Sequence, residues 1–219
     1  MGTMTTPRSR TAPIVPDPVL TGLTSGRLTT GAELDGIQVS GDLRELRAPD
    51  VRAIESELVD AQADEAMLRG GSWAESRWLR VSATSIDLAA SVFRDVVWDG
   101  CRFGAVTLSA GTVTRVLLRG CKVDYVNLRQ ATITDLTIES CTIGELDLGE
   151  ARLSRVRVIT SEVGSLMLSG SRSEQVDVSG AGLLRLEGLD GLRGITLSQE
   201  QAHDLAPALV RHLGGQVAE

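Results

Sequence analysis

The stretch GCKVDYVNLRQATITDLTIESC, residues 120–141, holds two of the three cysteines of this 219-residue chain. Cys121 and Cys141 are twenty residues apart, and Cys101 lies twenty residues before the first. Apolar residues also recur at every fifth position through the stretch. Neither an α-helix, with a period of about 3.6 residues, nor a plain strand, with a period of about two, sustains such a spacing. The stretch therefore predicts a repeat architecture.

The five-residue repeat extends far beyond this stretch. Every fifth residue from Leu88 to Leu183 reads L F W F L V L V L I I I L L V V L S V L, in which nineteen of twenty are apolar and Ser173 is the exception. The residue two before each centre alternates between a large aliphatic and Ala, Ser, Gly or Cys. A chain that points an apolar residue inward every five residues turns a corner each time. Four sides close one coil of twenty residues, so that residue n lies over residue n+20.

The polar residues test this prediction independently of the apolar pattern. Opposite charges and hydroxyls recur at twenty-residue spacing, and parallel coils in register place such residues about 4.8 Å apart. Pairs of this kind stabilise a sheet by about 0.2–1 kcal/mol each. The predicted stacks are Asp95/Arg115/Asp135/Arg155, Asp99/Arg119/Glu139, Thr112/Thr132, Thr114/Thr134/Ser154, Trp73/Phe93 and Trp78/Trp98.

The units CKVDY VNLRQ ATITD LTIES CTIGE LDLGE ARLSR, residues 121–155, resemble the pentapeptide-repeat family. The resemblance covers at least residues 86–186. It implies an all-β fold, a right-handed quadrilateral parallel β-helix with four faces and about twenty residues per coil. The central position departs from the family pattern of Phe or Leu, because Leu, Val and Ile dominate here and the aromatic centres group at Phe93, Trp98 and Phe103.

Three segments are predicted along the chain. Residues 1–31 hold four of the six prolines among Thr, Ser and Arg, which predicts a disordered or extended tail. Residues 32–197 form the β-helix; an α-helix over residues 50–69 is the alternative there, but it would place Glu65 on the apolar stripe. Residues 198–219 form a C-terminal capping and dimerisation helix, with a capping box at Ser198 and Gln201. Its predicted homodimer contacts are Leu205, Leu209, Val210 and Leu213.

Composition excludes several functional classes. The net charge of −7 argues against direct nucleic-acid binding, which needs clustered Lys and Arg. We find no apolar run long enough to span a membrane and no secretion signal, so we expect a cytoplasmic protein with three free thiols. Catalytic motifs are absent, and the only histidines, His203 and His212, fall on the predicted helix. We therefore expect no enzyme activity, no cofactor and no metal.

An acidic collar is the strongest candidate site. The second residue after successive centres reads Glu45, Asp50, Glu55, Asp60 and Glu65, and residues 33–65 contain ten acids and three arginines. One interpretation is a charged surface that keeps the first coil soluble. The other is an electronegative surface for a basic protein partner. Quinolone-resistance members of the resembling family are held to mimic DNA and to occupy the DNA-binding surface of gyrase, which implies gyrase as a possible partner.

A second candidate surface is apolar. Val97 and Leu117 precede their centres by one residue, so they are predicted to point outward and to stack, with Val92 nearby. A contiguous patch of this kind is typical of a protein contact. The function predicted from all of these observations is a non-enzymatic interaction protein that binds another protein through its β-helix surface. A purely structural scaffold with no role at a topoisomerase is the alternative.

Overall fold

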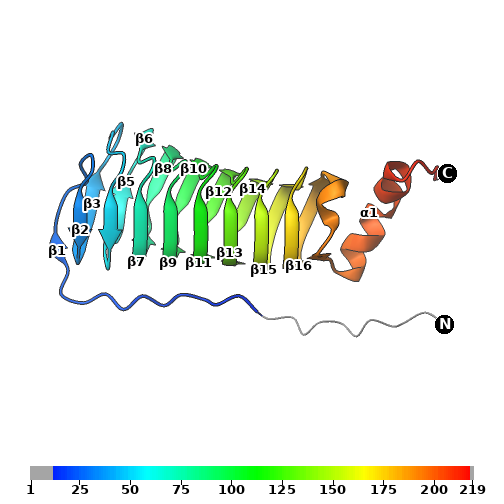
Figure 1. Ribbon diagram of the computed structural model, residues 1–219, viewed down its shortest axis with the longest axis horizontal. Coiled ribbons are helices and arrows are strands. Elements are labelled where there is room, and N and C mark those ends of the chain that lie inside the picture. Colours follow the sequence, from blue (N-terminus) through cyan, green and yellow to red (C-terminus); the bar gives the residue numbers. More distant parts are fainter. Residues whose placement is uncertain (1–11, 218–219) are drawn as a thin grey trace.

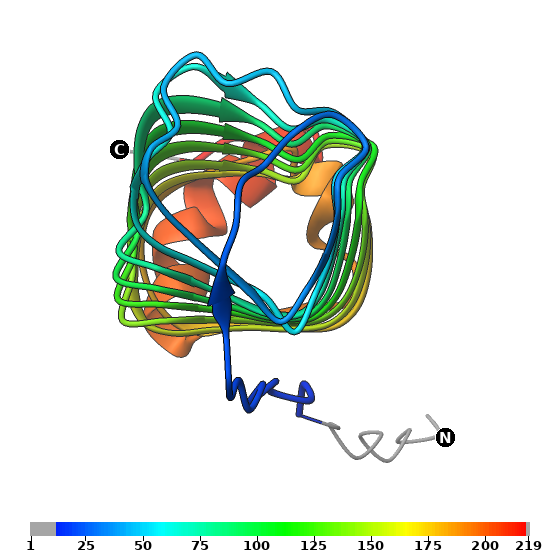
Figure 2. The same ribbon diagram turned by 90° about the vertical axis from the view of Figure 1, so that its left-hand side faces the viewer.

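The computed structural model describes residues 12–217 and shows a parallel β-helix closed at its C-terminal end by one α-helix (Figure 1). Viewed along the axis, successive coils superpose as a four-sided tube (Figure 2). The strands are β1 (Thr24–Ser25), β2 (Glu33–Asp35), β3 (Ile37–Asp42), β4 (Arg52–Ile54), β5 (Glu57–Gln62), β6 (Ala66–Met67), β7 (Ser72–Leu79), β8 (Ser82–Asp87), β9 (Val92–Asp99), β10 (Arg102–Thr107), β11 (Thr112–Arg119), β12 (Lys122–Asn127), β13 (Thr132–Glu139), β14 (Thr142–Asp147), β15 (Arg152–Met167), β16 (Arg172–Glu187) and β17 (Ile195–Thr196).

The register of the coils is the predicted one. Strand β11 pairs in parallel with β13 at a spacing of twenty residues, as in Val113↔Ile133, and the same spacing joins β9 to β11. The first coil is one residue shorter: β3 and β5 pair at nineteen up to Ser40↔Val59 and at twenty from Gly41↔Ala61. The predicted four-sided β-helix with twenty residues per coil is therefore confirmed.

The core is a column of aliphatic side chains with one aromatic cluster. The ring centroids of Trp78 and Trp98 lie 5.0 Å apart with nearly parallel planes, and Trp73 stacks on Phe93 at 6.4 Å. Both predicted stacks are confirmed. Because each interior column runs through successive coils, buried side chains lie directly over one another, as Val113 does over Ile133.

Left-handed backbone conformations form corners of the tube. Asp95, Arg115, Asp135 and Arg155, at one corner of successive coils, have φ values of 57°, 50°, 58° and 52°. A single residue with positive φ turns the chain sharply while the residues on both sides stay extended. In the regular coils this local turn recurs at three of the four corners, as at Ala90, Asp95 and Gly100, and it helps to convert a linear repeat into a closed coil.

Two predicted boundaries can be compared with the structure. Residues 50–69 contain β4, β5 and β6, so the coil is confirmed there and the alternative α-helix is excluded. The predicted start of the β-helix at residue 32 is too late, because β1 already pairs with β3 and Leu28 lies in the core. Residues 12–23 form no helix or strand and run back along the outside of the tube (Figure 1). Residues 1–11, also assigned to the tail, lie outside the described residues.

The C-terminal end is covered by a 3₁₀ helix, η1 (Leu189–Leu192), and by α1 (Gln199–His212). Ser198 accepts a hydrogen bond from the Gln201 backbone N–H, and the Gln201 side chain accepts one from the Ser198 N–H, which confirms the predicted capping box. Gln201 is buried and its Nε2 donates to the carbonyl oxygens of Val178 and Ala181. Those two carbonyl oxygens belong to the last full coil, where no further strand supplies N–H donors for them.

Residues 12–217 contain a single α-helix, which has 14 residues. No helix in this part of the chain is long and apolar enough to cross a membrane.

Candidate protein-interaction surfaces

The five residues of the acidic collar, Glu45, Asp50, Glu55, Asp60 and Glu65, all lie at corners with positive φ. All five are exposed. Their φ values lie between 46° and 59°, a region that costs a residue with a Cβ about 1–2 kcal/mol. Asp tolerates this conformation better than Glu does, yet three of the five are Glu. The corner geometry directs each carboxylate away from the tube and into solvent.

Only one collar carboxylate is neutralised within the described residues. Arg80, one coil further on, donates to both Asp60 oxygens at 2.7 and 2.8 Å, and this hydrogen bonding lowers the pKa of Asp60. Glu45, Asp50, Glu55 and Glu65 have no ion pair within residues 12–217. The collar therefore presents four uncompensated negative charges around one end of the tube.

Beyond the collar, opposite charges pair between coils. Arg115 binds Asp95 at 2.5 and 2.6 Å, Arg119 binds Asp99 at 2.6 Å, and Arg129 contacts both Asp147 and Glu150. These ion pairs neutralise most of the charged side chains that were predicted to alternate in sign between coils. The net negative charge lies mainly toward the N-terminal end, because residues 33–65 hold ten acids and three arginines whereas residues 66–219 hold 18 acids and 16 basic residues.

The predicted apolar patch is not free. Val97 and Leu117 do pair directly and belong to an outward column that continues to Thr137. Yet the three residues are only 6%, 4% and 4% exposed, respectively. An outward position on a single tube should be open to water, so another part of the chain must cover this face. Val92, on the adjoining face, remains 42% exposed.

The cover is a segment that we call the N-terminal strap, residues 12–20. It runs beside the tube roughly parallel to its axis (Figure 1). The Ile14 backbone N–H donates to Asp135 Oδ1 at 3.2 Å, and the Arg77 guanidinium donates to the Pro18 carbonyl oxygen. Burial alternates along the strap, since Pro16 and Pro18 are buried while their neighbours are exposed.

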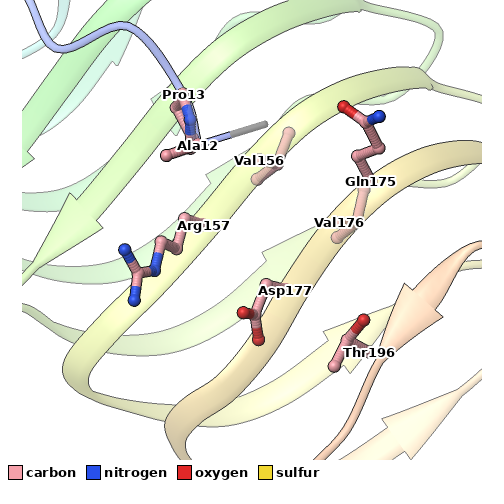
Figure 3. Close-up of a pocket in the computed structure, with 8 residues that line it drawn as sticks. All are labelled: Ala12, Pro13, Val156, Arg157, Gln175, Val176, Asp177 and Thr196. Atoms are coloured by element: carbon pink, nitrogen blue, oxygen red, sulfur yellow. The ribbon is translucent and has the colours of Figure 1, made fainter. Parts of the chain in front are cut away.

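A pocket of about 270 Å³ lies where the strap meets the last coils (Figure 3). Ala12 and Pro13 line one side of it. The opposite side comes from β15, β16 and β17 and carries Arg157, Asp177 and Thr196. The pocket has one side chain of each charge, and Asp177 and Thr196 in it are register partners on β16 and β17.

The predicted dimer helix has one side buried against the tube and another exposed to solvent. Leu205 packs against the core and Leu209 is half-buried, whereas Val210 is 36% exposed and Leu213 is 83% exposed. Leu184, at the end of β16, is 86% exposed. One side of α1 thus covers the last coil, and its C-terminal half leaves apolar side chains in solvent.

The histidines and the cysteines lie in different environments. His203 and His212 are both exposed. Cys101, Cys121 and Cys141 are buried and free, and each thiol donates to the backbone carbonyl of a preceding coil. Within residues 12–217, no three His, Cys, Asp or Glu side chains are arranged to hold a metal ion.

The strap was the feature that sequence reasoning missed. Its prolines predict a disordered or extended tail, whereas residues 12–20 lie docked against the tube. The signal that could have indicated a docked segment is the alternation Pro16–Asp17–Pro18, because prolines two apart in an extended chain face the same side.

Comparisons with known proteins give likeness at the level of fold. No family model matches the chain, and no curated protein matches it. A trypsin-treated variant of QnrB1, a plasmid-mediated fluoroquinolone resistance protein, aligns over 89% of this chain and 96% of its own, with 12% identity and a TM-score of 0.40. HetL, a pentapeptide repeat protein of the cyanobacterium Nostoc sp. strain PCC 7120, aligns over 78% and 91%, with 15% identity and a TM-score of 0.46. By the geometry of its own twenty-residue, four-sided coils, this chain has the fold of the pentapeptide-repeat proteins.

Proposed function

We propose that this protein is a non-enzymatic interaction protein that binds a basic surface of another protein through its acidic collar. The observation that carries the proposal is the group of four uncompensated carboxylates, Glu45, Asp50, Glu55 and Glu65, at exposed corners of one end. Acidic residues gathered at one end raise the local negative potential and speed the approach of a basic partner.

The reach of the collar side chains supports this role. Glu45, Glu55 and Glu65 hold their carboxylates further from the backbone than Asp would. That reach suits contact with Arg or Lys side chains on another molecule.

A specific version of the proposal takes DNA gyrase as the partner, as the family resemblance implies. A side-on mimic of DNA needs unpaired negative charge along the rod, since the duplex carries about one charge per 1.7 Å. Here the charges beyond the collar nearly balance, since residues 66–219 hold 18 acidic and 16 basic side chains. The collar therefore favours contact through the N-terminal end of the tube.

The test compares two triple variants of equal charge change. The collar variant carries Glu45→Gln, Glu55→Gln and Glu65→Gln; the control carries Glu162→Gln, Glu174→Gln and Glu187→Gln. We expect purified wild-type protein to alter gyrase supercoiling at micromolar concentration, the control to do the same, and the collar variant to lose the effect. No effect of the wild-type protein would discard gyrase as the partner.

Partner capture tests the general form. Proteins cross-linked to the wild type in a source lysate should be retained by the control variant and depleted in the collar variant. Equal recovery with both variants would show that the collar only solubilises the first coil. A scaffold without a partner at the collar would then be the better description.

A separate observation supports the scaffold alternative. Leu184 and Leu213 are more than four-fifths exposed toward the C-terminal end of the chain, and Val210 and Val217 are 36% and 50% exposed. We propose that two copies join there about a two-fold axis, because a self-complementary patch suits such an interface. The dimer would carry its acidic collars at opposite tips.

A further inference from the structure

We propose that the outward column Val97, Leu117 and Thr137 is a binding site for an extended, proline-containing segment of another protein. The chain's own strap is the resident occupant. The proposal rests on the geometry of the strap and does not depend on the collar being a partner site.

The strap advances along the axis of the tube by about the same distance as the column that it covers. From Arg77 to the level of Asp135 the tube advances three coils, or about 14 Å at about 4.8 Å per coil. The strap covers the same distance from Pro18 to Ile14, because four extended residues at about 3.3 Å each span about 13 Å. Polar contacts exist at both ends of this span, so the strap is held along its length.

The resident occupant defines the chemistry of the site. Two buried rings, those of Pro16 and Pro18, face the tube, and the exposed Asp17 lies between them. The Asp17 carboxylate is 3.7 Å from the Arg77 guanidinium. A docked segment needs apolar rings two residues apart, an acidic residue near Arg77, and a backbone N–H for Asp135. Preformed extended segments rich in proline lose little conformational entropy on docking and are common ligands of shallow apolar grooves.

The strap buries only some of its apolar side chains, so a segment that buries more of them can replace it. Ile14, Val15 and Val19 are 57%, 52% and 79% exposed, so three of its large aliphatic side chains gain little from docking. A covalently attached segment nevertheless competes at an effective concentration of about millimolar. A partner segment that also buries apolar side chains at those three positions would displace it.

Thiol labelling of the full chain tests whether the strap covers the column. Val97→Cys places a thiol under the strap, and the buried native cysteines serve as the internal reference for unfolding. Pro16→Gly with Pro18→Gly removes the two buried rings; Val15→Gly with Val19→Gly is the matched control at exposed strap positions. We expect the first pair to speed labelling at residue 97 by about tenfold and the control pair to change it far less.

Two results would overturn the placement of the strap. One is rapid labelling of Val97→Cys with the wild-type strap, as fast as that of Val92→Cys on the adjoining exposed face. The other is equal acceleration by both glycine pairs. Fast labelling of the native cysteines would mean unfolding, and Val97→Ser with hydrogen exchange at residues 96–98 then replaces the thiol readout.

Peptide binding tests the site itself. The probe is a fluorescent peptide of sequence APIVPDPVL, residues 12–20, measured by anisotropy. We expect the Pro16→Gly/Pro18→Gly chain to bind it at least about tenfold more tightly than the wild type, because the intramolecular competitor is weakened. Adding Leu117→Glu, an outward substitution that leaves the core intact, should abolish the binding.

Equal binding by the loosened chain and its Leu117→Glu derivative would overturn the assignment of the column. So would failure of the loosened chain to bind the peptide. If the loosened chain instead forms a dimer that depends on concentration and takes up no peptide, the occupant is the strap of a second copy, and the proposal of a partner segment is wrong. Gyrase and capture assays of the collar variants report separately on the proposed function.

Discussion

Arg155 binds Asp135 from the neighbouring coil through two parallel hydrogen bonds of 2.6 and 2.8 Å. The Asp135 side chain is only 3% exposed, and it also accepts the Ile14 N–H of the strap. The Arg155 hydrogen bonds, with smaller help from Ile14, hold the pKa of Asp135 below its ordinary value. One carboxylate therefore ties two coils and the strap together.

We expect Asp135→Asn to lower the free energy of unfolding by about 2 kcal/mol, since charged hydrogen bonds contribute about 1.5–3 kcal/mol. The depressed pKa adds a pH dependence: the stabilisation is present above the ordinary Asp pKa of about 4 and is lost as the pH falls below it. Urea denaturation at pH 7 and pH 3 should show a difference between wild type and variant that shrinks at pH 3. A difference independent of pH would contradict the ionic contribution.

We expect three free thiols that label slowly in the native protein. Hydrogen bonding to the Cys101 thiol, together with burial, raises the pKa of Cys121 to about 12, and the same causes, with Cys121 as the neighbour, raise that of Cys141. The unfolded chain ionises near pH 8.5 to 9, so stability should fall as the pH rises above about 9. Replacing Cys101, Cys121 and Cys141 with Ser should reduce this alkaline loss. Rapid labelling of all three thiols at neutral pH would contradict the buried ladder.

Removing the side chain at a collar corner should not destabilise the tube. Glu55→Gly and Glu65→Gly relieve a positive φ that costs about 1–2 kcal/mol, against about 0.4–1 kcal/mol for the greater freedom of Gly in the unfolded chain. We expect an unchanged or higher melting temperature for both. The control Glu162→Gly, in the extended part of β15, should destabilise by about 0.5–1 kcal/mol. Equal losses at all three positions would contradict the corner explanation.

The proposed dimer predicts a particle of about twice 23.3 kDa by light scattering. Leu213→Glu and Leu184→Glu each place a charge in the apolar C-terminal surface and should yield monomers. Val19→Glu, at an equally exposed aliphatic position on the strap, should leave the dimer intact. A monodisperse wild-type monomer would leave α1 as a simple cap of the last coil.

Repeated local interactions made most of the fold predictable. The spacing of five residues, the stacks such as Trp78 on Trp98, and the capping box at Ser198 and Gln201 each follow from residues at fixed short intervals. Every coil repeats the same pattern, so one irregular unit does not hide the period that the other units share. The collar was predictable for the same reason, because its members occupy one position of the repeat.

The tertiary structure alone decided which of the outward residues are available. Periodicity places Val97 and Leu117 on the outside, but it carries no information on a segment about eighty to one hundred residues earlier that covers them. The strap has no repeat, and its hold on the tube comes from single contacts, Ile14 to Asp135 and Pro18 to Arg77, whose partners no spacing rule connects. The sequence by itself determined the coil, because its apolar residues can be buried only by closing one; the contact between strap and tube is nonlocal and nonperiodic, and it was visible only in the folded chain.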